Sequence, residues 1–362
     1  MNTLASQSKT LSELFHSRLS LSAQDETYRV KTQGSWIPTT WGEFGARVES
    51  LAAGMLDLGV KRGDTVAILA ETVPQWCEID MATIDIGAMN LGIYQTLLAD
   101  QISFILQDSG AKAIFVMGEE LFETVHPLLD SLPELESIVV WDHKPEPAEG
   151  IIHLDSLVLR GRNRLKTDPS LVERASAEVQ PSDKALAVYT SGTTGQPKGV
   201  PLTHTNILSS LRAGESLVEE ISTEDITLSF LPMAHVAEHV PGFFGRINLG
   251  LRTAYCDSYD TVLDDLKDIR PTYFGAVPRI FEKMYGRIHE EVAKANPRRQ
   301  AIFFWAKSLA QRRAQAEMSG RPLSMVDRIG WAVANKLIYT RIRAVFGGRV
   351  KAFVTGSAPI QL

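Results

Sequence analysis

Short apolar runs alternate with longer amphipathic segments along this chain, and that alternation constrains the fold more than any other feature. Residues 65–69, 113–117 and 137–141 have the length and apolar content of buried strands. Between and around them lie helical patterns, at residues 41–58, 74–87, 99–108 and 119–132. Strands that alternate with helices in this way are typical of a parallel sheet with helices on its faces. The sequence therefore predicts an α/β fold with parallel-rich sheets flanked by helices.

The length of 362 residues exceeds one ordinary module, so we expect two packed α/β subdomains. A polar connection at residues 168–183 separates them, which predicts a first subdomain over 1–180 and a second over 181–362. The second includes a helical extension at about 297–346.

Composition excludes several classes of protein. The net charge of −6 argues against a nucleic-acid partner, whose binding would need a basic surface. The two cysteines, Cys77 and Cys256, are far apart and give no disulfide framework or metal-ligand spacing. No apolar run reaches the roughly 18 residues of a spanning helix. We expect a cytoplasmic protein, with peripheral contact on the inner membrane face left open.

A glycine- and hydroxyl-rich loop follows the expected strand at residues 185–189, and a helix is expected from about residue 205. Its glycines allow main-chain N–H groups to converge on an anion, and its hydroxyls and lysine suit polyphosphate and Mg²⁺. It does not have the spacing of a Walker A loop, because proline precedes the lysine and glycine follows it. The alternative is a flexible surface turn. The contributing residues are Thr190, Ser191, Gly192, Thr193, Thr194, Gly195, Lys198 and Gly199.

A histidine-containing segment follows at residues 230–239. His235, Glu238 and His239 match a zinc-protease pattern literally, but the segment follows a strand and a proline downstream of the phosphate loop. A plain helix with structural histidines is a second alternative. An imidazole beside a phosphate would hydrogen-bond the anionic oxygens of a transition state. His239 lies one helical turn from His235, a spacing that suits one common pocket.

Together these segments resemble the adenylate-forming superfamily, which includes acyl-CoA synthetases, luciferases and peptide-synthetase adenylation domains. The resemblance implies the large N-terminal domain of those enzymes, and it implies ATP, Mg²⁺ and CoA. It assigns catalytic roles to His235 and Lys198, and substrate contacts to His235 and His239. Thr190 is the candidate Mg²⁺ ligand. Where some members have an aromatic gate to the acyl tunnel, this sequence has His239.

Two further segments carry the resemblance toward the C-terminus. Residues 275–285 resemble the Val-Pro-Arg segment of long-chain fatty acyl-CoA synthetases, although its apolar residues Ile280 and Phe281 also suit a plain core helix. A loop resembling the family's adenine pocket follows the last expected strand, and it contains Gly356, Ser357, Ala358 and Pro359.

The resemblance implies a long-chain fatty acid–CoA ligase that forms an acyl-adenylate and then acyl-CoA from fatty acid and CoA. Family members continue beyond residue 362, so we expect the chain to be incomplete at its C-terminus. Two alternatives stay open: a ligase for another carboxylic acid, medium-chain or aryl, or a non-catalytic fragment that binds nucleotide or acyl chain. An aromatic cluster at residues 302–305, flanked by Lys and Arg, suggests contact with an anionic membrane.

Overall fold

The computed structural model describes residues 3–190, 196–215 and 221–356, which fall into two compact units. Unit 1 comprises residues 1–225 and 229–255, and unit 2 comprises residues 226–228 and 256–362. This division differs from the subdomain boundary expected near residue 180. The two strands that follow that boundary, Lys184–Thr190 and Lys198–Thr203, belong to the main sheet of unit 1. The first of them pairs with Met89–Ile93, which precedes the boundary in the chain.

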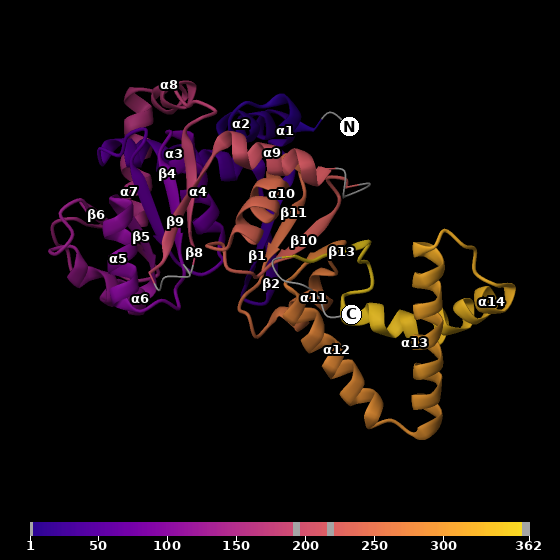
Figure 1. Cartoon of the computed structure of the whole chain (residues 1–362). Coiled ribbons are helices and arrows are strands. Elements are labelled where there is room, and N and C mark those ends of the chain that lie inside the picture. The colour runs from indigo at the N-terminus through magenta and orange to yellow at the C-terminus, as the bar shows by residue number, and fades with distance from the viewer. Residues whose placement is uncertain (1–2, 191–195, 216–220, 357–362) are drawn as a thin grey trace. The chain divides into compact units, whose positions relative to one another are not determined.

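Unit 1 is built on a seven-stranded sheet of order β7-β6-β5-β3-β4-β8-β9 (Figure 1). Every neighbouring pair is parallel except β8 and β9, which are antiparallel. The α/β class predicted from the sequence is confirmed. The strands are β3 (Thr65–Leu69), β4 (Met89–Ile93), β5 (Ala111–Met117), β6 (Ser137–Trp141), β7 (Ile151–His153), β8 (Lys184–Thr190) and β9 (Lys198–Thr203).

Helices cover both faces of this sheet, because successive strand residues point to opposite sides. On β3, Val66 and Ile68 belong to one apolar cluster and Ala67 and Leu69 to another. The first cluster packs on α3 (Trp41–Asp57), α4 (Pro74–Asp85), α7 (Leu154–Thr167) and α8 (Leu171–Ala177), and the second on α5 (Ala99–Ser109), α6 (Gly118–Val125) and η1 (His126–Leu128).

Helices α3 and α7 pack unusually closely, and a glycine makes this approach possible. A Cβ on Gly161 of α7 would lie 1.8 Å from the carbonyl oxygen of Ser50 and 2.7 Å from the nitrogen of Gly54. Both atoms belong to the α3 backbone, so no side-chain movement would relieve the overlap.

A smaller sheet in unit 1 joins distant parts of the chain. β1 (Glu26–Thr32) pairs antiparallel with β2 (Ser35–Thr40) and parallel with β11 (Arg252–Tyr255). Helical segments of the unit that lie outside the main sheet are α1 (Leu4–Gln7), α2 (Leu11–Ser22), α9 (His204–Glu215), the π-helix η2 (Glu238–Phe244) and α10 (Gly245–Leu249).

Unit 2 has a parallel pair of short strands and a long run of helices. The backbone nitrogen of Thr272 donates to the carbonyl oxygen of Ile226 in β10 (Ile226–Ser229) at 2.9 Å. The expected helical extension is present. The elements are α11 (Val262–Ile269), β12 (Tyr273–Gly275), α12 (Pro278–Ala293), α13 (Pro297–Met318), α14 (Met325–Ala334), the π-helix η3 (Asn335–Tyr339), α15 (Thr340–Val345) and β13 (Ala352–Val354). No helix among the described residues is long and apolar enough to cross a membrane.

Candidate functional site

The phosphate-binding segment lies in a β-hairpin, and this corrects the expectation that it connects a strand directly to a helix. β9 intervenes before α9 begins at His204. β9 is the edge strand of the seven-stranded sheet, a position in which its Pro201 is tolerated. Ser191, Gly192, Thr193, Thr194 and Gly195 lie outside the described residues.

The two ends of the hairpin loop bring a hydroxyl and an ammonium group to one face. Thr190, at the end of β8, is paired in register with Lys198, at the start of β9. Directly opposite residues of an antiparallel pair project to the same face. Both residues are exposed. The stem therefore presents one hydroxyl and one cation together.

Glycine at position 199 is required by a ring that lies against it. A Cβ there would come within 2.9 Å of a ring carbon of Tyr189. The Tyr189 hydroxyl donates to Oδ2 of Asp108, near the end of α5, at 2.7 Å. Burial of the ring and the neighbouring carboxylate raise the pKa of the Tyr189 phenol, so it stays protonated as donor. This contact ties the hairpin stem to α5.

The histidine segment is fixed at the carboxyl end of the same sheet. Thr72, just after β3, donates its hydroxyl to the carbonyl oxygen of Leu231 at 2.7 Å and accepts from the nitrogen of Met233 at 3.2 Å. On the neighbouring strand β4, a Cβ on Gly92 would lie 2.9 Å from the Cα of Ala234. Since β3, β4 and β8 are parallel, this segment and Thr190 lie at the same sheet edge. Ligands of open α/β sheets bind at that edge.

His235 keeps one ring nitrogen for a ligand. Its Nδ1 accepts a hydrogen bond from the backbone nitrogen of Ala237 at 3.1 Å. A neutral imidazole that accepts at Nδ1 carries its proton at Nε2. The ring is half-buried. His235 is thus oriented as a hydrogen-bond donor.

His239 occupies a different environment from His235. It is 2% exposed, and its Nε2 lies 2.8 Å from Oδ2 of Asp80 on α4. Its ring packs edge-on against Trp76 and stacks on Phe244. Burial raises the pKa of the Asp80 carboxyl, and the hydrogen bond from His239 opposes that shift. Sequence reasoning missed Asp80, because no local pattern connects positions 159 residues apart.

Glu238, the potential base of the zinc-protease pattern, is also engaged elsewhere. Its Oε1 accepts from the Ser229 hydroxyl at 2.6 Å and lies 3.0 Å from Arg246. Burial raises the pKa of this carboxyl, and the arginine opposes the shift. Among the described residues, no group of three or more His, Cys, Asp or Glu is arranged to hold a metal ion. The zinc pattern therefore has no structural counterpart in these residues.

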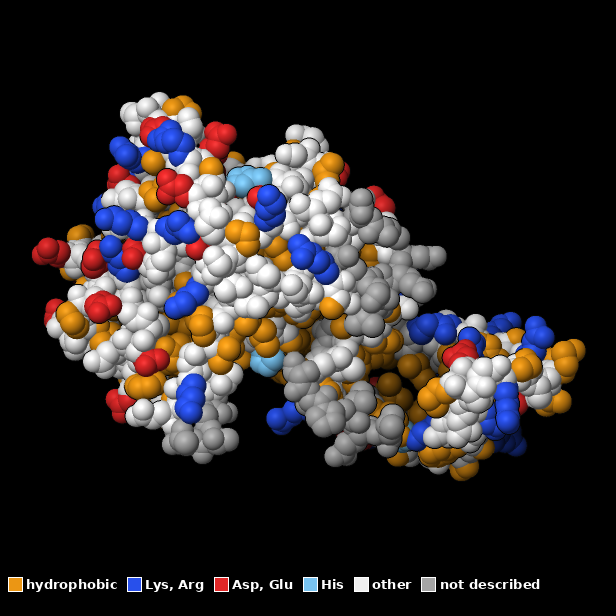
Figure 2. Space-filling model, turned by 45° about the horizontal axis from the view of Figure 1, so that its top comes forward, with side chains coloured by type: hydrophobic (Ala, Val, Ile, Leu, Met, Phe, Trp, Pro, Cys, Tyr) orange, Lys and Arg blue, Asp and Glu red, His pale blue; other side chains and the backbone are white. Residues whose placement is uncertain are grey.

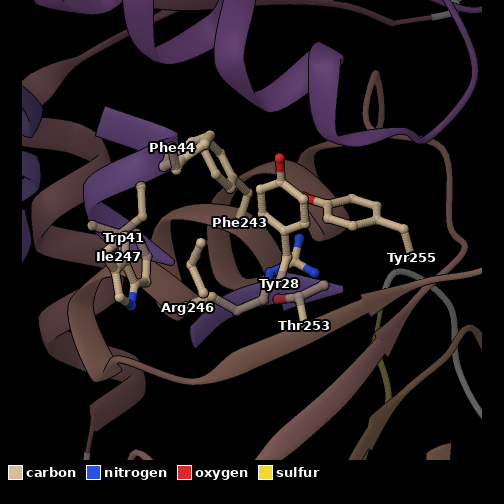
Figure 3. Close-up of a pocket in the computed structure, with 9 residues that line it drawn as sticks. Tyr28, Trp41, Phe44, Phe243, Arg246, Ile247, Thr253 and Tyr255 are labelled. Atoms are coloured by element: carbon tan, nitrogen blue, oxygen red, sulfur yellow. The ribbon is translucent and has the colours of Figure 1, made fainter. Parts of the chain in front are cut away.

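A very small cavity lies beside this buried ion pair (Figure 3). Tyr28, Phe44, Phe243 and Tyr255 converge around Arg246 in the close-up, with the two tyrosine rings edge to face. The cavity volume is about 10 Å³, enough for no more than one water. As it stands, this space does not hold an acyl chain.

The two motifs of unit 2 are placed separately. In the Val-Pro-Arg segment, Ile280 is buried, and the Phe281 ring packs edge to face on Phe274 of β12 and Phe353 of β13. Phe274 and Ile280 are buried in the core of unit 2, whereas Phe353 is 51% exposed. The polar residues of the segment face outward, lining with Tyr259 an open hollow of about 490 Å³: Arg279, Glu282 and Lys283.

The adenine-pocket segment begins just after β13. Gly356 is exposed, and a Cβ built on it would meet nothing within 4 Å. Ser357, Ala358 and Pro359 lie outside the described residues. Their assignment to a nucleotide pocket stays a prediction.

A hydroxyl, a lysine and a donor imidazole thus lie at the carboxyl ends of the parallel strands of this α/β domain. A family model described as "AMP-binding enzyme" matches residues 21–362. The chain therefore belongs to the AMP-binding enzyme family.

Two relatives with similar sequences are named for long-chain acyl substrates. The long-chain-fatty-acid–CoA ligase FadD15 of Mycobacterium bovis is 31% identical over 92% of this chain and 54% of its own length. The peroxisomal long chain acyl-CoA synthetase 7 of Arabidopsis thaliana is 30% identical over 92% and 46%. The inhibitor-bound N-terminal domain of FACL13 from Mycobacterium tuberculosis superimposes with a TM-score of 0.61 at 26% identity, covering 76% of this chain and 65% of that one. The chain spans about half the length of these two curated relatives.

Proposed function

We propose that this chain is the nucleotide-binding part of a long-chain fatty acid–CoA ligase. In the first half-reaction a fatty acid carboxylate oxygen attacks the α-phosphorus of ATP, and the bond to the bridging oxygen breaks to release pyrophosphate. In the second, the thiol of CoA takes the acyl group and AMP leaves. The observation that supports this proposal best is the pairing of Thr190 with Lys198 at the sheet edge where the His235 segment is seated.

Lys198 and Thr190 suit the phosphates of ATP. A lysine is a mobile point charge for polyphosphate, and a hydroxyl both donates to phosphate oxygens and ligates Mg²⁺. Mg²⁺ usually keeps several waters and takes its other ligands from the substrate phosphates, so one protein hydroxyl is a sufficient donor set. The ion would neutralise charge on the leaving pyrophosphate. Lys198 would hold that pyrophosphate in line with the attacking oxygen.

His235 would act on the reacting centre through its Nε2–H. With Nδ1 engaged by Ala237, Nε2 is the ring nitrogen that would donate to a substrate oxygen. A donor fixed before reaction stabilises oxygen charge that develops in the transition state. This role predicts a larger effect on adenylation rate than on ATP affinity when His235 is replaced.

The acyl substrate is inferred from the relatives. Both curated relatives quoted above are named for long-chain acyl substrates. Activation of medium-chain or aryl acids, and nucleotide or acyl binding without turnover, are the competing outcomes. A cytoplasmic location is part of the same proposal.

The test combines ATP binding with pyrophosphate exchange. We expect Lys198→Met to weaken Mg·ATP binding about 10- to 100-fold, the range of one charge-assisted hydrogen bond lost. Lys184→Met is the matched control, because Lys184 is exposed at the opposite end of β8. Pyrophosphate exchange is then measured with saturated fatty acids of graded length.

The outcomes separate the alternatives. Exchange that rises with chain length supports a long-chain substrate, whereas a maximum at medium-chain or aryl acids assigns the site to those substrates. ATP binding without any pyrophosphate exchange would indicate a chain that binds nucleotide but does not catalyse adenylation. Equal ATP affinities for the two lysine variants contradict the proposed phosphate site.

A further inference from the structure

Helix α14 and the π-helix η3 expose a continuous stripe of large apolar side chains. Val326 is 80% exposed, Ile329 65% and Val333 47%. The spacing of three and four residues places these side chains on one helical face. Met325 and Leu337 extend the stripe at its two ends, and both are exposed. Single exposed apolar residues are ordinary, but a contiguous row marks an interaction surface.

The stripe is not needed for the core of the helical segment. The opposite face of α14 and η3 packs on α13: Ala334 is fully buried in a cluster with Ala306 and Leu309, and Trp331 packs on it. The Tyr339 hydroxyl donates to the carbonyl oxygen of Ala306 at 2.7 Å. The helices are therefore held together by one face, and the other remains available.

The same segment is strongly basic. Residues 297–346 contain ten Lys or Arg and two Asp or Glu, although the whole chain has a net charge of −6. Both acidic side chains are already paired within the segment: Asp327 with Arg312 at 2.9 Å and Glu317 with Arg313 at 2.7 Å. The remaining basic side chains have no acidic partner inside the segment. In Figure 2, orange apolar and blue basic side chains gather over this helical part, with little red.

Basic side chains flank the apolar stripe directly. Arg321 precedes α14, Arg328 lies on α14, Lys336 lies on η3, and Arg341 follows on α15; all four are exposed. A helix with one exposed apolar face and basic flanks has the pattern of a segment that lies in a membrane interface. Basic residues near anionic lipid add attraction that salt screens.

We infer that the stripe Met325, Val326, Ile329, Val333 and Leu337, with its basic flanks, docks unit 2 on an anionic lipid surface. Excess positive charge distinguishes this partner from a second copy of the chain, because two such faces would repel each other. The sequence pattern had drawn attention to residues 302–305 instead. In the structure Phe303 is buried against His289. The other three residues, Ile302, Phe304 and Trp305, are 38%, 50% and 40% exposed, less than Val326 and Ile329 on α14.

The test is partition of the 362-residue chain onto vesicles of phosphatidylcholine with and without 30% phosphatidylglycerol, where ~30% is an ordinary anionic content. We expect binding to the anionic vesicles only, falling as salt rises. The double variant Val326→Ser with Ile329→Ser should lose at least ~10-fold in partition, since each removes a large apolar contact. Leu159→Ser is the matched control, because Leu159 on α7 is 58% exposed.

Charge is tested separately from apolar contact. Arg328→Gln with Lys336→Gln should lower partition roughly 25-fold, about fivefold for each cation near the surface. Arg160→Gln, an exposed arginine on α7 in unit 1, should have little effect. Circular dichroism and the ATP-binding assay establish that each variant is folded, so loss of vesicle binding is read independently of the nucleotide site.

Four results would overturn the inference. These are absence of wild-type partition, equal partition onto neutral vesicles, unchanged binding of the serine double variant, and a dimer that this variant dissociates. A further test uses a polypeptide extended to the length of the relatives, with a fluorophore on Ile329→Cys. If the fluorophore is already in an apolar environment without vesicles, another part of that protein covers the stripe.

Discussion

His204 makes the stability of unit 1 dependent on pH, and its environment gives the size of the effect. The residue is fully buried at the start of α9. Its Nδ1 accepts from the backbone nitrogen of Leu11, at the start of α2, at 3.0 Å. Its Nε2 is buried without a hydrogen-bond partner. Burial lowers the pKa of His204 to about 4, against 6.5 for an ordinary histidine, and Asp183 only partly opposes the shift.

A histidine with a lowered pKa in the folded state destabilises the fold under acid. Above pH 6.5 the ring is neutral in both states and its contribution is complete. As pH falls from 6.5 toward about 4, the unfolded state binds a proton that the folded state excludes. Between pH 7.5 and 5.0 this linkage lowers the free energy of unfolding by about 2 kcal/mol.

The assay is urea denaturation of the wild type and of His204→Asn at several values of pH. Asparagine provides an acceptor oxygen near the position of Nδ1 but does not titrate. The variant should lose stability at every pH, yet its stability should fall by about 2 kcal/mol less than that of the wild type over this range. Other titrating groups are common to both proteins. Identical pH dependence in the two proteins would refute the reasoning.

Two further predictions concern packing in unit 1. Gly161→Ala should lower the free energy of unfolding by more than ~3 kcal/mol, because the added Cβ would overlap the α3 backbone. The control is Gly214→Ala on α9, whose Cβ would meet nothing within 4 Å, and it should be neutral or slightly stabilising. Equal denaturation midpoints for the two variants would contradict the close contact. His239→Leu should cost about 3–5 kcal/mol by leaving Asp80 buried and unpaired. Adding Asp80→Asn should recover part of that loss in the same denaturation assay, and no recovery would argue against the pair.

Local patterns predicted much of the fold. The capping box of Thr40 and Glu43 begins α3. Such a helix start can be read from the sequence because both partners lie within four residues. The sequence also predicted the α/β class and the long helices after Pro297. It did not predict the second strand of the hairpin after Thr190: a loop was expected there, with a helix from about residue 205, and α9 begins at His204. β9 forms by pairing with β8, and strand formation depends on contacts with such a partner more than on the intrinsic preferences of its own residues.

The amino-acid sequence by itself supplied the chemical groups of the candidate site: Thr190 and Lys198 stand out in a glycine- and hydroxyl-rich loop, and the family resemblance adds His235. Only the tertiary structure decided which groups remain available to a ligand. His239 and Glu238 are both polar and adjacent, yet Asp80 and Arg246 hold them in the interior, while His235 keeps Nε2. The physical reason is that burial and ion pairing arise between residues distant in the chain, and a local pattern carries no information about them.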